Sequence, residues 1–483
     1  MSEKKKSLKL NFILNSILSM SSFLFALVTF PYVSRVLTAE GLGKVNFAIS
    51  LISYIAIFSQ LGIPVYGIRA CAKVRDDKVK LSRTVQELMI IQFGTTVIAY
   101  VILFGLLLMV PKLQNDRMLY IVAGFNIFLL YIGMEWLYRA LEMYAYITAR
   151  SVVFKVIALL GMFILVKGKA DYIKYAGIFI FATSASGCLN LFYARKYIYL
   201  KPVGGYNFRQ HIKPVFVFFA MACATTIYTN LDTVMLGFMT SDTDVGYYST
   251  AVKVKALLVS LVTSIGTVLL PRASYYIQND MKEDFLKIIK KSLNFIMLAS
   301  APLALYFMVF AEYGIRFLAG DGYEGAVIPM IVIMPTLLLI GLSNVTGIQV
   351  LVPMGREKTV LVSELVGAVI DLILNALLIP LFASTGAAIG TLIAEMAVLS
   401  CQYLSAGKLF KNAARGIPYR KIIAALVVAV LCSGWIMQMQ LGDFLTLLVS
   451  AILFFGSYSI CMLLWKEPLF MEILQRKERG NKK

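Results

Sequence analysis

The apolar residues of this chain come in repeated blocks of about 20, and that length is what a helix needs to cross a bilayer. The chain has 483 residues, of which 59% are hydrophobic and only 15% are charged. A soluble domain carries about 25% charged residues. We therefore predict an all-α, polytopic membrane protein whose fourteen transmembrane helices lie near residues 10–33, 45–68, 84–110, 118–138, 146–166, 172–194, 212–238, 247–270, 292–311, 324–350, 359–382, 385–406, 421–439 and 444–465.

The basic residues are distributed unevenly between the two sides of the predicted membrane. Most of the 46 Lys and Arg lie in connections on one side, which the positive-inside rule makes cytoplasmic. Both termini are then cytoplasmic, and the formal charge of +20 serves topology and contact with anionic lipid rather than nucleic acid. The first apolar segment has no small-residue cleavage site, so we expect a retained helix. Basic residues flank both ends of the chain: Lys4, Lys5, Lys6, Arg476, Lys477, Arg479, Lys482 and Lys483.

The sequence gives no sign of a metal site or a cofactor, either in its cysteines and histidine or in known catalytic motifs. The six cysteines have no paired spacing and lie in or next to apolar segments, where Cys acts as a small hydrophobe. We expect His211, the only histidine, to be a surface residue, and a single histidine makes no proton relay by itself. The sequence lacks GxxxxGK[ST], HExxH, GxSxG and CxxC motifs, which argues against an ATPase or a hydrolase.

The chain also contains two related halves. A connection around 195–211, rich in charge, Pro and Gly, separates the sixth and seventh spans. Six spans in each half make a parallel repeat, in which substrate binds between the two lobes. We predict an N-terminal lobe at 1–198, a C-terminal lobe at 199–415, and two further spans with a basic tail at 416–483. The repeat shows at a constant offset of 203, because Gly43, Ala48, Arg69 and Ala70 recur as Gly246, Ala251, Arg272 and Ala273.

Three lysines interrupt apolar segments: Lys155, Lys253 and Lys255. A charge at such depth costs several kcal/mol and usually faces a partner or a wet cavity. On a helical wheel Lys253 lies on a polar face, whereas Lys255 points to the opposite side. We predict that Lys253 lines a cavity, with a structural ion pair as the alternative, and we assign no role to Lys155 or Lys255. The polar face of this eighth span consists of Ser249, Lys253, Ser260, Ser264 and Thr267.

Similar polar stripes recur in other spans. Small polar side chains at helical spacing line cavities, but they also form hydrogen bonds between neighbouring helices. The stripes are Asn11, Asn15, Ser19, Ser22 and Thr29 in the first span, Thr225, Thr229, Asp232 and Thr233 in the seventh, Glu364, Asp371 and Asn375 in the eleventh, and Glu395 near Thr391 and Gln402 in the twelfth.

Together these stripes predict a polar cavity with an excess of basic residues. Such a cavity suits an anionic substrate, above all a phosphate or pyrophosphate, which Lys and Arg bind through charge-assisted hydrogen bonds. The acids could take up H⁺ or Na⁺ and couple transport to an ion gradient, or each could pair with a lysine. The basic candidates besides Lys253 are Arg35, Lys44, Arg69, Lys155 and Arg272, and the coupling candidates are Asp232, Glu364, Asp371 and Glu395.

Two stretches resemble the bacterial polysaccharide-repeat-unit flippases. FPYVSRVLTAEGLGKVNFA at 30–48 resembles the junction of the family's first and second helices. NLDTVMLG at 230–237 and DVGYYSTAVKV at 244–254 are similar to its seventh and eighth helices. The family is part of the multidrug/oligosaccharidyl-lipid/polysaccharide exporter superfamily. The resemblance implies two six-helix lobes in a MATE-like V-shaped arrangement plus two C-terminal helices, with Lys253 matching a basic residue that lines the family's cavity.

The resemblance also implies a function that is not enzymatic. It implies a flippase that moves undecaprenyl-diphosphate-linked oligosaccharide across the bacterial cytoplasmic membrane by alternating access, for capsule, O-antigen or teichuronic-type polysaccharide. Its partners would be this lipid, the bilayer, and the polymerase and glycosyltransferases of the same pathway. A MATE-type drug/cation antiporter is the alternative, although the first span lacks the acid that such antiporters often carry. A membrane polysaccharide polymerase would need a sizeable outer loop, and the outer loops here are short.

Overall fold

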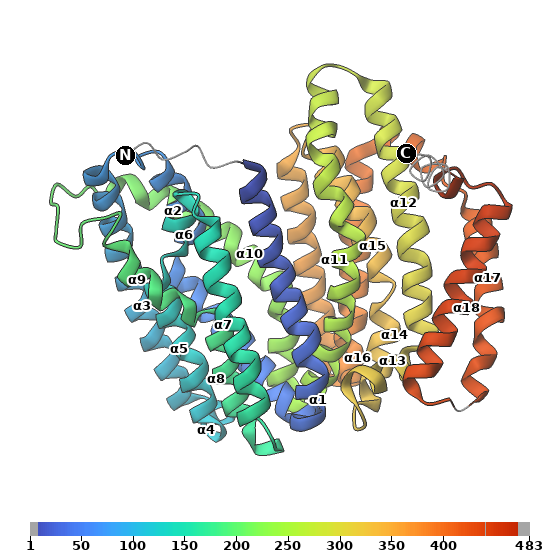
Figure 1. Ribbon diagram of the computed structural model, residues 1–483, viewed down its shortest axis with the longest axis horizontal. Coiled ribbons are helices and arrows are strands. Elements are labelled where there is room, and N and C mark those ends of the chain that lie inside the picture. The colour runs from blue at the N-terminus through green and yellow to red at the C-terminus, as the bar shows by residue number, and fades with distance from the viewer. Residues whose placement is uncertain (1–7, 440, 472–483) are drawn as a thin grey trace. The chain divides into compact units, whose positions relative to one another are not determined.

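The computed structural model describes residues 8–439 and 441–471, and these ranges contain helices and no strand (Figure 1). The basic residues at 4–6 and 476–483 lie outside the described residues. The prediction of an all-α membrane fold is confirmed. Eleven helices are long and apolar enough to cross a membrane, or twelve if the bent pair of α8 and α9 counts as one span; the total of fourteen stays a prediction.

The helices follow the predicted segments closely. Helix is favoured here because it pairs its own backbone N–H and C=O groups, for which lipid offers no hydrogen-bond partner. The elements are α1 (Leu8–Gln60), α2 (Ile63–Ala72), α3 (Lys78–Met109), α4 (Pro111–Asn115), α5 (Arg117–Gly133), α6 (Glu135–Ala140), α7 (Tyr144–Leu165), η1 (Lys169–Asp171), α8 (Tyr172–Thr183), η2 (Ala185–Gly187), α9 (Cys188–Ala194), α10 (Arg209–Met239), α11 (Asp242–Gln278), α12 (Lys282–Val309), α13 (Ala311–Ala319), η3 (Glu324–Ala326), α14 (Val327–Ile333), α15 (Thr336–Asn344), the π-helix η4 (Val345–Leu351), α16 (Glu357–Ala414), α17 (Tyr419–Gly434), η5 (Trp435–Met439) and α18 (Asp443–Leu464).

The two longest helices, α1 and α16, are each interrupted by non-helical residues. In α1 the break is Thr38, with φ 64° and ψ 174°. In α16 the breaks are Ala383, with φ 47°, and Gly407, with φ 59°. Thr38 and Ala383 fall between predicted spans, so the sequence pattern marked both interruptions. A positive φ is rare for residues other than glycine, and each break therefore depends on the packing around it.

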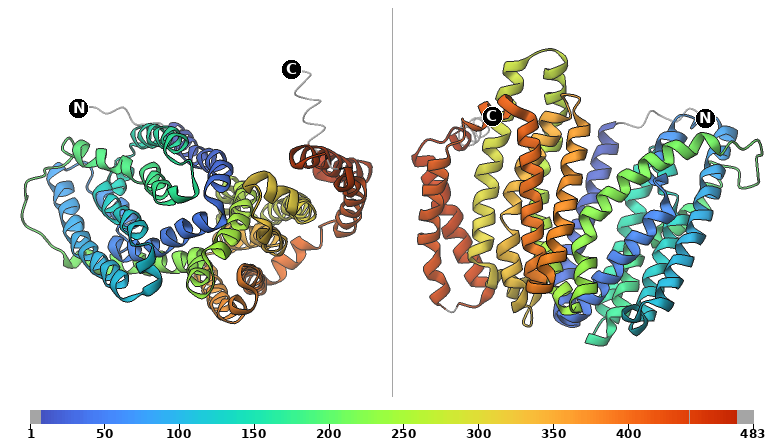
Figure 2. Two further views of the ribbon diagram at one scale, coloured as in Figure 1. Left: turned by 90° about the horizontal axis from the view of Figure 1, so that it is seen from below. Right: turned by 180° about the vertical axis from the view of Figure 1, so that it is seen from behind.

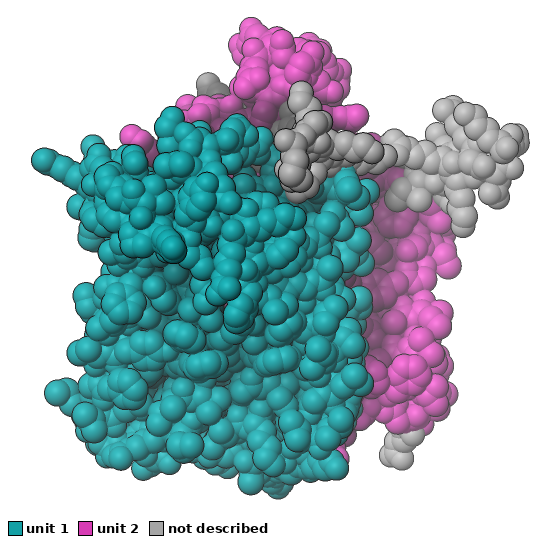
Figure 3. All heavy atoms as spheres, turned by 60° about the vertical axis from the view of Figure 1, so that its left-hand side comes forward, with its two compact units in different colours: residues 1–246 teal, residues 247–483 magenta. Residues whose placement is uncertain are grey.

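The structure separates into two compact units, Met1–Gly246 and Tyr247–Lys483 (Figure 3). Unit 1 and unit 2 are described separately below. The boundary between the units lies inside α11, whereas the sequence analysis divided the lobes at 198/199 and ended the second at 415. That division into lobes stays a prediction.

In unit 1 the long helix α1 packs against α3, α5, α7 and α10. A separate apolar cluster joins α2, α3 and α6, and its members include Ile63, Leu88 and Tyr138. The turn before α2 also fixes α10. Gly62 has φ 72°, and a Cβ there would lie 2.7 Å from the carbonyl oxygen of Val215. Only a glycine allows this approach of the α10 backbone, so α10 is held tightly within unit 1.

The predicted linker between the halves is fixed to the first turns of α3. Ser82 Oγ accepts the Tyr199 N–H at 2.8 Å, and Arg83 Nε donates to the Gly204 carbonyl at 3.0 Å. The Gln86 amide donates to the carbonyls of Tyr199 and Lys201 at 2.7 and 2.8 Å. Residues 82, 83 and 86 share one face of α3. The linker is therefore a docked segment rather than a loose tether.

In unit 2, α12, α14, α15, α16 and η4 pack together, and the pair α17 and α18 packs on α12 and α13. This pair is the red element in Figure 2. The Tyr306 hydroxyl of α12 donates to the Leu447 carbonyl of α18 at 2.8 Å. An apolar groove of about 330 Å³ lies between α12 and α17, lined by Leu305, Ile423, Leu426, Val427, Val430 and Leu431.

Candidate functional site

The polar face of the eighth span lies on α11. Ser249 is buried, Lys253 is half-buried and Ser260 is exposed. The Ser260 hydroxyl donates to the Leu257 carbonyl at 2.7 Å, which leaves its oxygen able to accept from a ligand. Lys255 is also half-buried, but it projects from the opposite side of the helix. Ser264 and Thr267 lie outside the residues whose side chains the structure describes.

The seventh-span stripe lies on α10 in unit 1. Thr225 and Thr229 are exposed, and Asp232 is half-buried. The Thr225 hydroxyl donates to the Met221 carbonyl at 3.2 Å, and the Thr229 hydroxyl donates to the Thr225 carbonyl at 3.0 Å. Such bonds satisfy the donor within the helix. The Thr225 hydroxyl oxygen is left with lone pairs for a ligand, whereas Thr229 Oγ1 already accepts from the Asn230 amide at 2.9 Å and has one lone pair left.

The first-span stripe on α1 has one buried and one exposed asparagine, Asn11 and Asn15. Ser19 donates its hydroxyl to the Asn15 carbonyl at 3.1 Å. The sequence could not give the direction of Arg35, because Pro31 breaks the helical phase. In the structure the Arg35 side chain is exposed, and its Nη1 donates to the Pro31 carbonyl at 2.7 Å. The guanidinium therefore turns back along its own helix.

Arg69 and Arg272, the arginines related by the repeat, are both exposed within their units. Arg69 lies in the last turn of α2 in unit 1. Arg272 lies near the end of α11 in unit 2. Each guanidinium is thus available at the surface of its unit, and their role in holding an anion stays a prediction.

Lys155, which the sequence left without a role, meets the polar stripe of α1. Its side chain on α7 is buried, and Nζ donates to Ser21 Oγ at 3.0 Å and to Ser22 Oγ at 2.6 Å. Ser22 belongs to the predicted stripe. The hydroxyls supply polar partners to the buried ammonium, which explains how a lysine is tolerated inside an apolar segment.

A second basic group in unit 1 was missed in the sequence. Arg150, with a side chain that is 3% exposed, pairs with Glu135 at 3.2 Å and donates to the Ser186 carbonyl at 3.0 Å. Arg139 pairs with the other oxygen of Glu135 at 2.7 Å. The spacing of Glu135 and Arg139 at i and i+4 was a visible signal. These residues were overlooked because charges near the ends of spans are usually topology signals.

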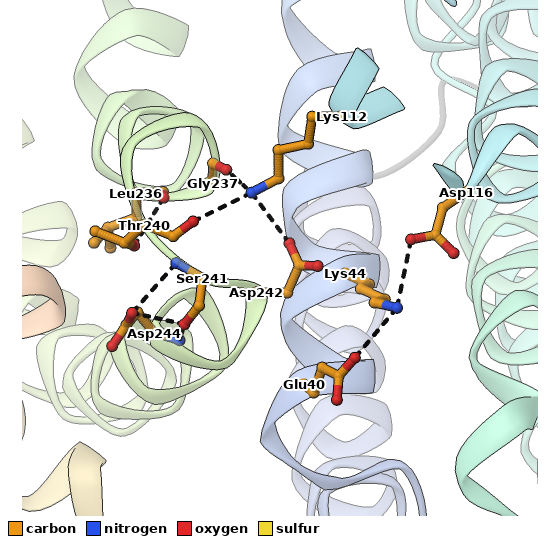
Figure 4. A network of polar contacts seen from close by, with 10 residues as sticks. All are labelled: Glu40, Lys44, Lys112, Asp116, Leu236, Gly237, Thr240, Ser241, Asp242 and Asp244. Carbon is orange, nitrogen blue, oxygen red and sulfur yellow. Dashed lines mark hydrogen bonds and ion pairs between the residues drawn. The ribbon is translucent and has the colours of Figure 1, made fainter. Parts of the chain in front are cut away.

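Two lysines of unit 1 form a polar network where α1, α4, α10 and α11 meet (Figure 4). Lys44 pairs with Glu40 at 3.3 Å and with Asp116 at 3.5 Å. Lys112 pairs with Asp242 at 3.5 Å and also donates to the Gly237 carbonyl at the end of α10. We predicted Lys44 as a cavity residue; in this structure its ammonium faces two carboxylates.

The repeat-related glycines lie in the same region and contact each other's surroundings reciprocally. A Cβ added to Gly43 would lie 1.7 Å from the Asp242 carbonyl oxygen. A Cβ added to Gly246 would lie 2.0 Å from the Ala39 carbonyl oxygen. Positions 39 and 242 are separated by the repeat offset, so each glycine meets the residue four positions before its repeat counterpart. Such reciprocity is typical of a two-fold contact, and it supports the parallel repeat.

Two of the predicted coupling acids are buried in unit 2. Asp371 and Glu395 are 3% and 5% exposed, whereas Glu364 is exposed. A Cβ added to Gly390 would lie 3.1 Å from Asp371 Oδ1 and 2.5 Å from the side-chain oxygen of Asn375. The segments on either side of the Ala383 break thus approach closely around an acid and an amide. In the described ranges no cluster of three or more His, Cys, Asp or Glu could hold a metal ion.

The expectation that His211 is a surface residue was wrong. His211 is 3% exposed, and its Nε2 lies 2.7 Å from Glu87 Oε2. Its position at the start of the seventh predicted span favoured a surface residue. The carboxylate partner is 124 positions away in the sequence, so no local pattern could reveal it.

Comparisons with known proteins identify relatives along most of the chain. The model of a family described as "Polysaccharide biosynthesis protein" matches residues 8–277, and a MatE model matches 218–377. A putative O-antigen transporter of Escherichia coli is 28% identical over 405 residues, which cover 83% of this chain and 97% of that protein. A probable low-salt glycan biosynthesis flippase of Haloferax volcanii is 23% identical over 218 residues, covering 45% of this chain and 42% of the relative.

Two solved structures share the fold at low sequence identity. The lipid II flippase MurJ in an inward closed conformation has a TM-score of 0.66 at 14% identity, with 92% of this chain and 99% of that chain covered. An inward-facing multidrug resistance MATE transporter has a TM-score of 0.57 at 13% identity, with 83% and 99% covered. The fold is therefore that of this class of membrane transporters.

Proposed function

We infer the function from one premise: the chain belongs to the polysaccharide biosynthesis protein family, whose model matches more than half of it. We propose that it moves undecaprenyl-diphosphate-linked oligosaccharide repeat units across the bacterial cytoplasmic membrane, by alternating access and without catalysing a reaction. The O-antigen transporter and glycan flippase relatives support this substrate class. Both termini would face the cytoplasm. The polymerase and glycosyltransferases of the pathway would act on the same lipid.

The observation that carries the proposal is the half-buried Lys253 on the polar face of α11. A pyrophosphate carries negative charge into a region where water is scarce, and a lysine there compensates that charge through charge-assisted hydrogen bonds. The exposed hydroxyls of Thr225 and Thr229 on α10 offer acceptors to sugar hydroxyl groups. The polyprenyl tail would stay in lipid, and the groove between α12 and α17 offers an apolar lining to a hydrocarbon chain.

A purified protein in liposomes tests this function directly. The vesicles contain a fluorescent polyprenyl-diphosphate-linked oligosaccharide, and an external reagent destroys the label in the outer leaflet. We expect the label to become almost fully accessible with the protein present, and about half accessible in protein-free vesicles. Equal accessibility in both preparations would contradict the proposal.

A drug/cation antiporter is the second candidate, because the MatE model matches residues 218–377 and the fold is shared with such transporters. It predicts that buried acids, rather than Lys253, are essential. Drug-susceptibility assays in cells that lack their own exporters distinguish the two. Increased resistance conferred by this chain, without flipping of the oligosaccharide lipid, would favour the antiporter.

The buried acids carry a prediction about coupling. We expect Asp371→Asn to weaken the dependence of transport on an H⁺ or Na⁺ gradient, because the amide keeps the shape of the side chain and cannot hold a cation by charge. Transport is measured in vesicles with and without each imposed gradient. Glu357→Gln is the matched control, since Glu357 is an exposed acid at the start of the same helix, α16, and is not a coupling candidate. Gradient-driven transport that is equal in wild type and Asp371→Asn would remove Asp371 from this role.

A further inference from the structure

A chain of three titratable side chains, two buried and one half-buried, lies in unit 1 where the linker enters α10. The Glu87 and His211 side chains are 0% and 4% exposed, and their closest atoms, Oε2 and Nε2, are 2.7 Å apart. On the other side of the imidazole, Nδ1 lies 2.8 Å from the Tyr66 hydroxyl. These residues come from α3, α10 and α2. His211 is also the only histidine of the chain.

The carboxylate of this chain also holds the linker. Glu87 Oε1 accepts the Asn207 backbone N–H at 2.5 Å, and Oε2 accepts from the Gln210 amide at 3.2 Å. Both oxygens therefore act as acceptors, as those of an ionised carboxylate do. Glu87 continues the α3 face on which Ser82 and Gln86 hold the linker. The Glu87–His211 pair thus connects both the linker and the first turn of α10 to α3.

The geometry allows the imidazole to gain or lose a proton without leaving a polar group unpaired. Nε2–H donates to Glu87 in either state. The Tyr66 hydroxyl donates to Nδ1 when the imidazole is neutral and accepts from Nδ1–H when it is cationic. An unpaired buried polar group would cost about 1–3 kcal/mol, and the rotating hydroxyl avoids this cost. Protonation at Nδ1 changes the charge of the Glu87–His211 pair from −1 to 0.

Other charged or titratable groups near the pair come from the same elements. Arg69 and Cys71 lie on α2, and both act electrostatically on Tyr66. Arg83 on α3 contacts the linker at Gly204. Arg209 and Lys213 flank His211 on α10 and are exposed. Arg83 is half-buried and lies one turn before Glu87 on α3, and its Nε is directed to the Gly204 carbonyl. The imidazole of His211 is in direct contact with the Glu87 carboxylate, at 2.7 Å.

We propose that Glu87, His211 and Tyr66 form a proton-binding site, and that the proton bound at His211 Nδ1 holds the linker and the start of α10 on α3. Without this proton the buried carboxylate loses the positive charge that is in direct contact with it, which is costly. Loss of the proton therefore weakens the docking of the linker. The site would make transport depend on pH, a consequence that rests on the proposed flippase function.

The first test uses the single histidine. Protein labelled with ¹⁵N-histidine, and purified through a tag without histidine, gives one pair of imidazole ¹⁵N signals. We expect Nδ1 to gain and lose a proton reversibly over the pH range in which the protein stays folded. In Glu87→Gln the proton should leave at lower pH, because the carboxylate charge is gone. Tyr66→Phe, which keeps the ring, should also alter the titration. Imidazole signals that stay constant over this range in folded wild-type protein would overturn the proposal.

The second test follows the linker and needs no substrate. Trypsin cuts after Lys196 and Arg209, and we expect cleavage of the wild type, relative to an unstructured control peptide, to increase as the pH rises. His211→Gln should remove this dependence. Cleavage of the wild type that follows the control at every pH would contradict the proposal. If His211 binds and releases the proton in a protein that moves no lipid, the proton-binding site is supported and the flippase function is refuted. A transport pH profile unchanged by His211→Gln would refute the effect on transport.

Discussion

Lys253→Ala is expected to remove export of surface polysaccharide while the protein level in the membrane stays normal. The half-buried ammonium lies on the polar face of α11, and hydrogen bonds that involve a charged group contribute about 1.5–3 kcal/mol. Losing them from the bound pyrophosphate corresponds to a decrease of about 10- to 100-fold in transport. Alanine favours helix, so we expect the span to be retained in the variant. The measurement is polysaccharide at the surface of cells whose own flippase gene is deleted, with the protein quantified in the same membranes.

Two matched variants separate the role of Lys253 from a general loss of charge. Lys255→Ala removes an ammonium two residues away on the opposite side of the same helix, and it should keep export near the wild-type level. Lys253→Arg keeps the charge and should retain part of the activity, because a guanidinium also binds phosphate oxygens. Full export with Lys253→Ala would show that the anionic group is held elsewhere.

The sequence predicted the helical fold well because its signal is local. Apolar length and polar interruption are properties of neighbouring residues, so the breaks at Thr38 and Ala383 fell between predicted spans. The helical wheel also separated the faces of Lys253 and Lys255. Each of these inferences needs only the geometry of one helix.

The partners of the buried charges could not be predicted, because they depend on which helices meet. Lys155 contacts Ser22 across 133 positions, and His211 contacts Glu87 across 124. A wheel shows that a side chain faces inwards, but it does not show what lies opposite. The charges of Glu87 and Arg150 lie near span ends, where the same residue types usually mark topology. From the sequence alone, a charged residue of a buried ion pair near a span end therefore cannot be distinguished from the many exposed charged residues there.

Gly246→Ala is expected to disrupt the contact between the repeat-related segments of unit 1. The new Cβ would lie 2.0 Å from the Ala39 carbonyl oxygen, and a backbone atom cannot move aside as a flexible side chain can. Overpacking of this kind costs about 1–3 kcal/mol or more, so we expect a lower melting temperature in detergent and reduced export. Gly43→Ala should behave alike, because its Cβ would lie 1.7 Å from the Asp242 carbonyl oxygen.

The glycines of exposed helix surfaces provide the control for this prediction. A Cβ at Gly161 in α7 or Gly105 in α3 meets nothing within 4 Å, and alanine favours helix by about 1 kcal/mol over glycine. Gly161→Ala and Gly105→Ala should therefore melt at or above the wild-type temperature. The double variant Gly43→Ala, Gly246→Ala should lose less stability than the sum of the single losses, because both act on one contact and residues that share a contact are not additive. Wild-type melting and export in Gly246→Ala would mean that the two segments do not pack this closely in the membrane.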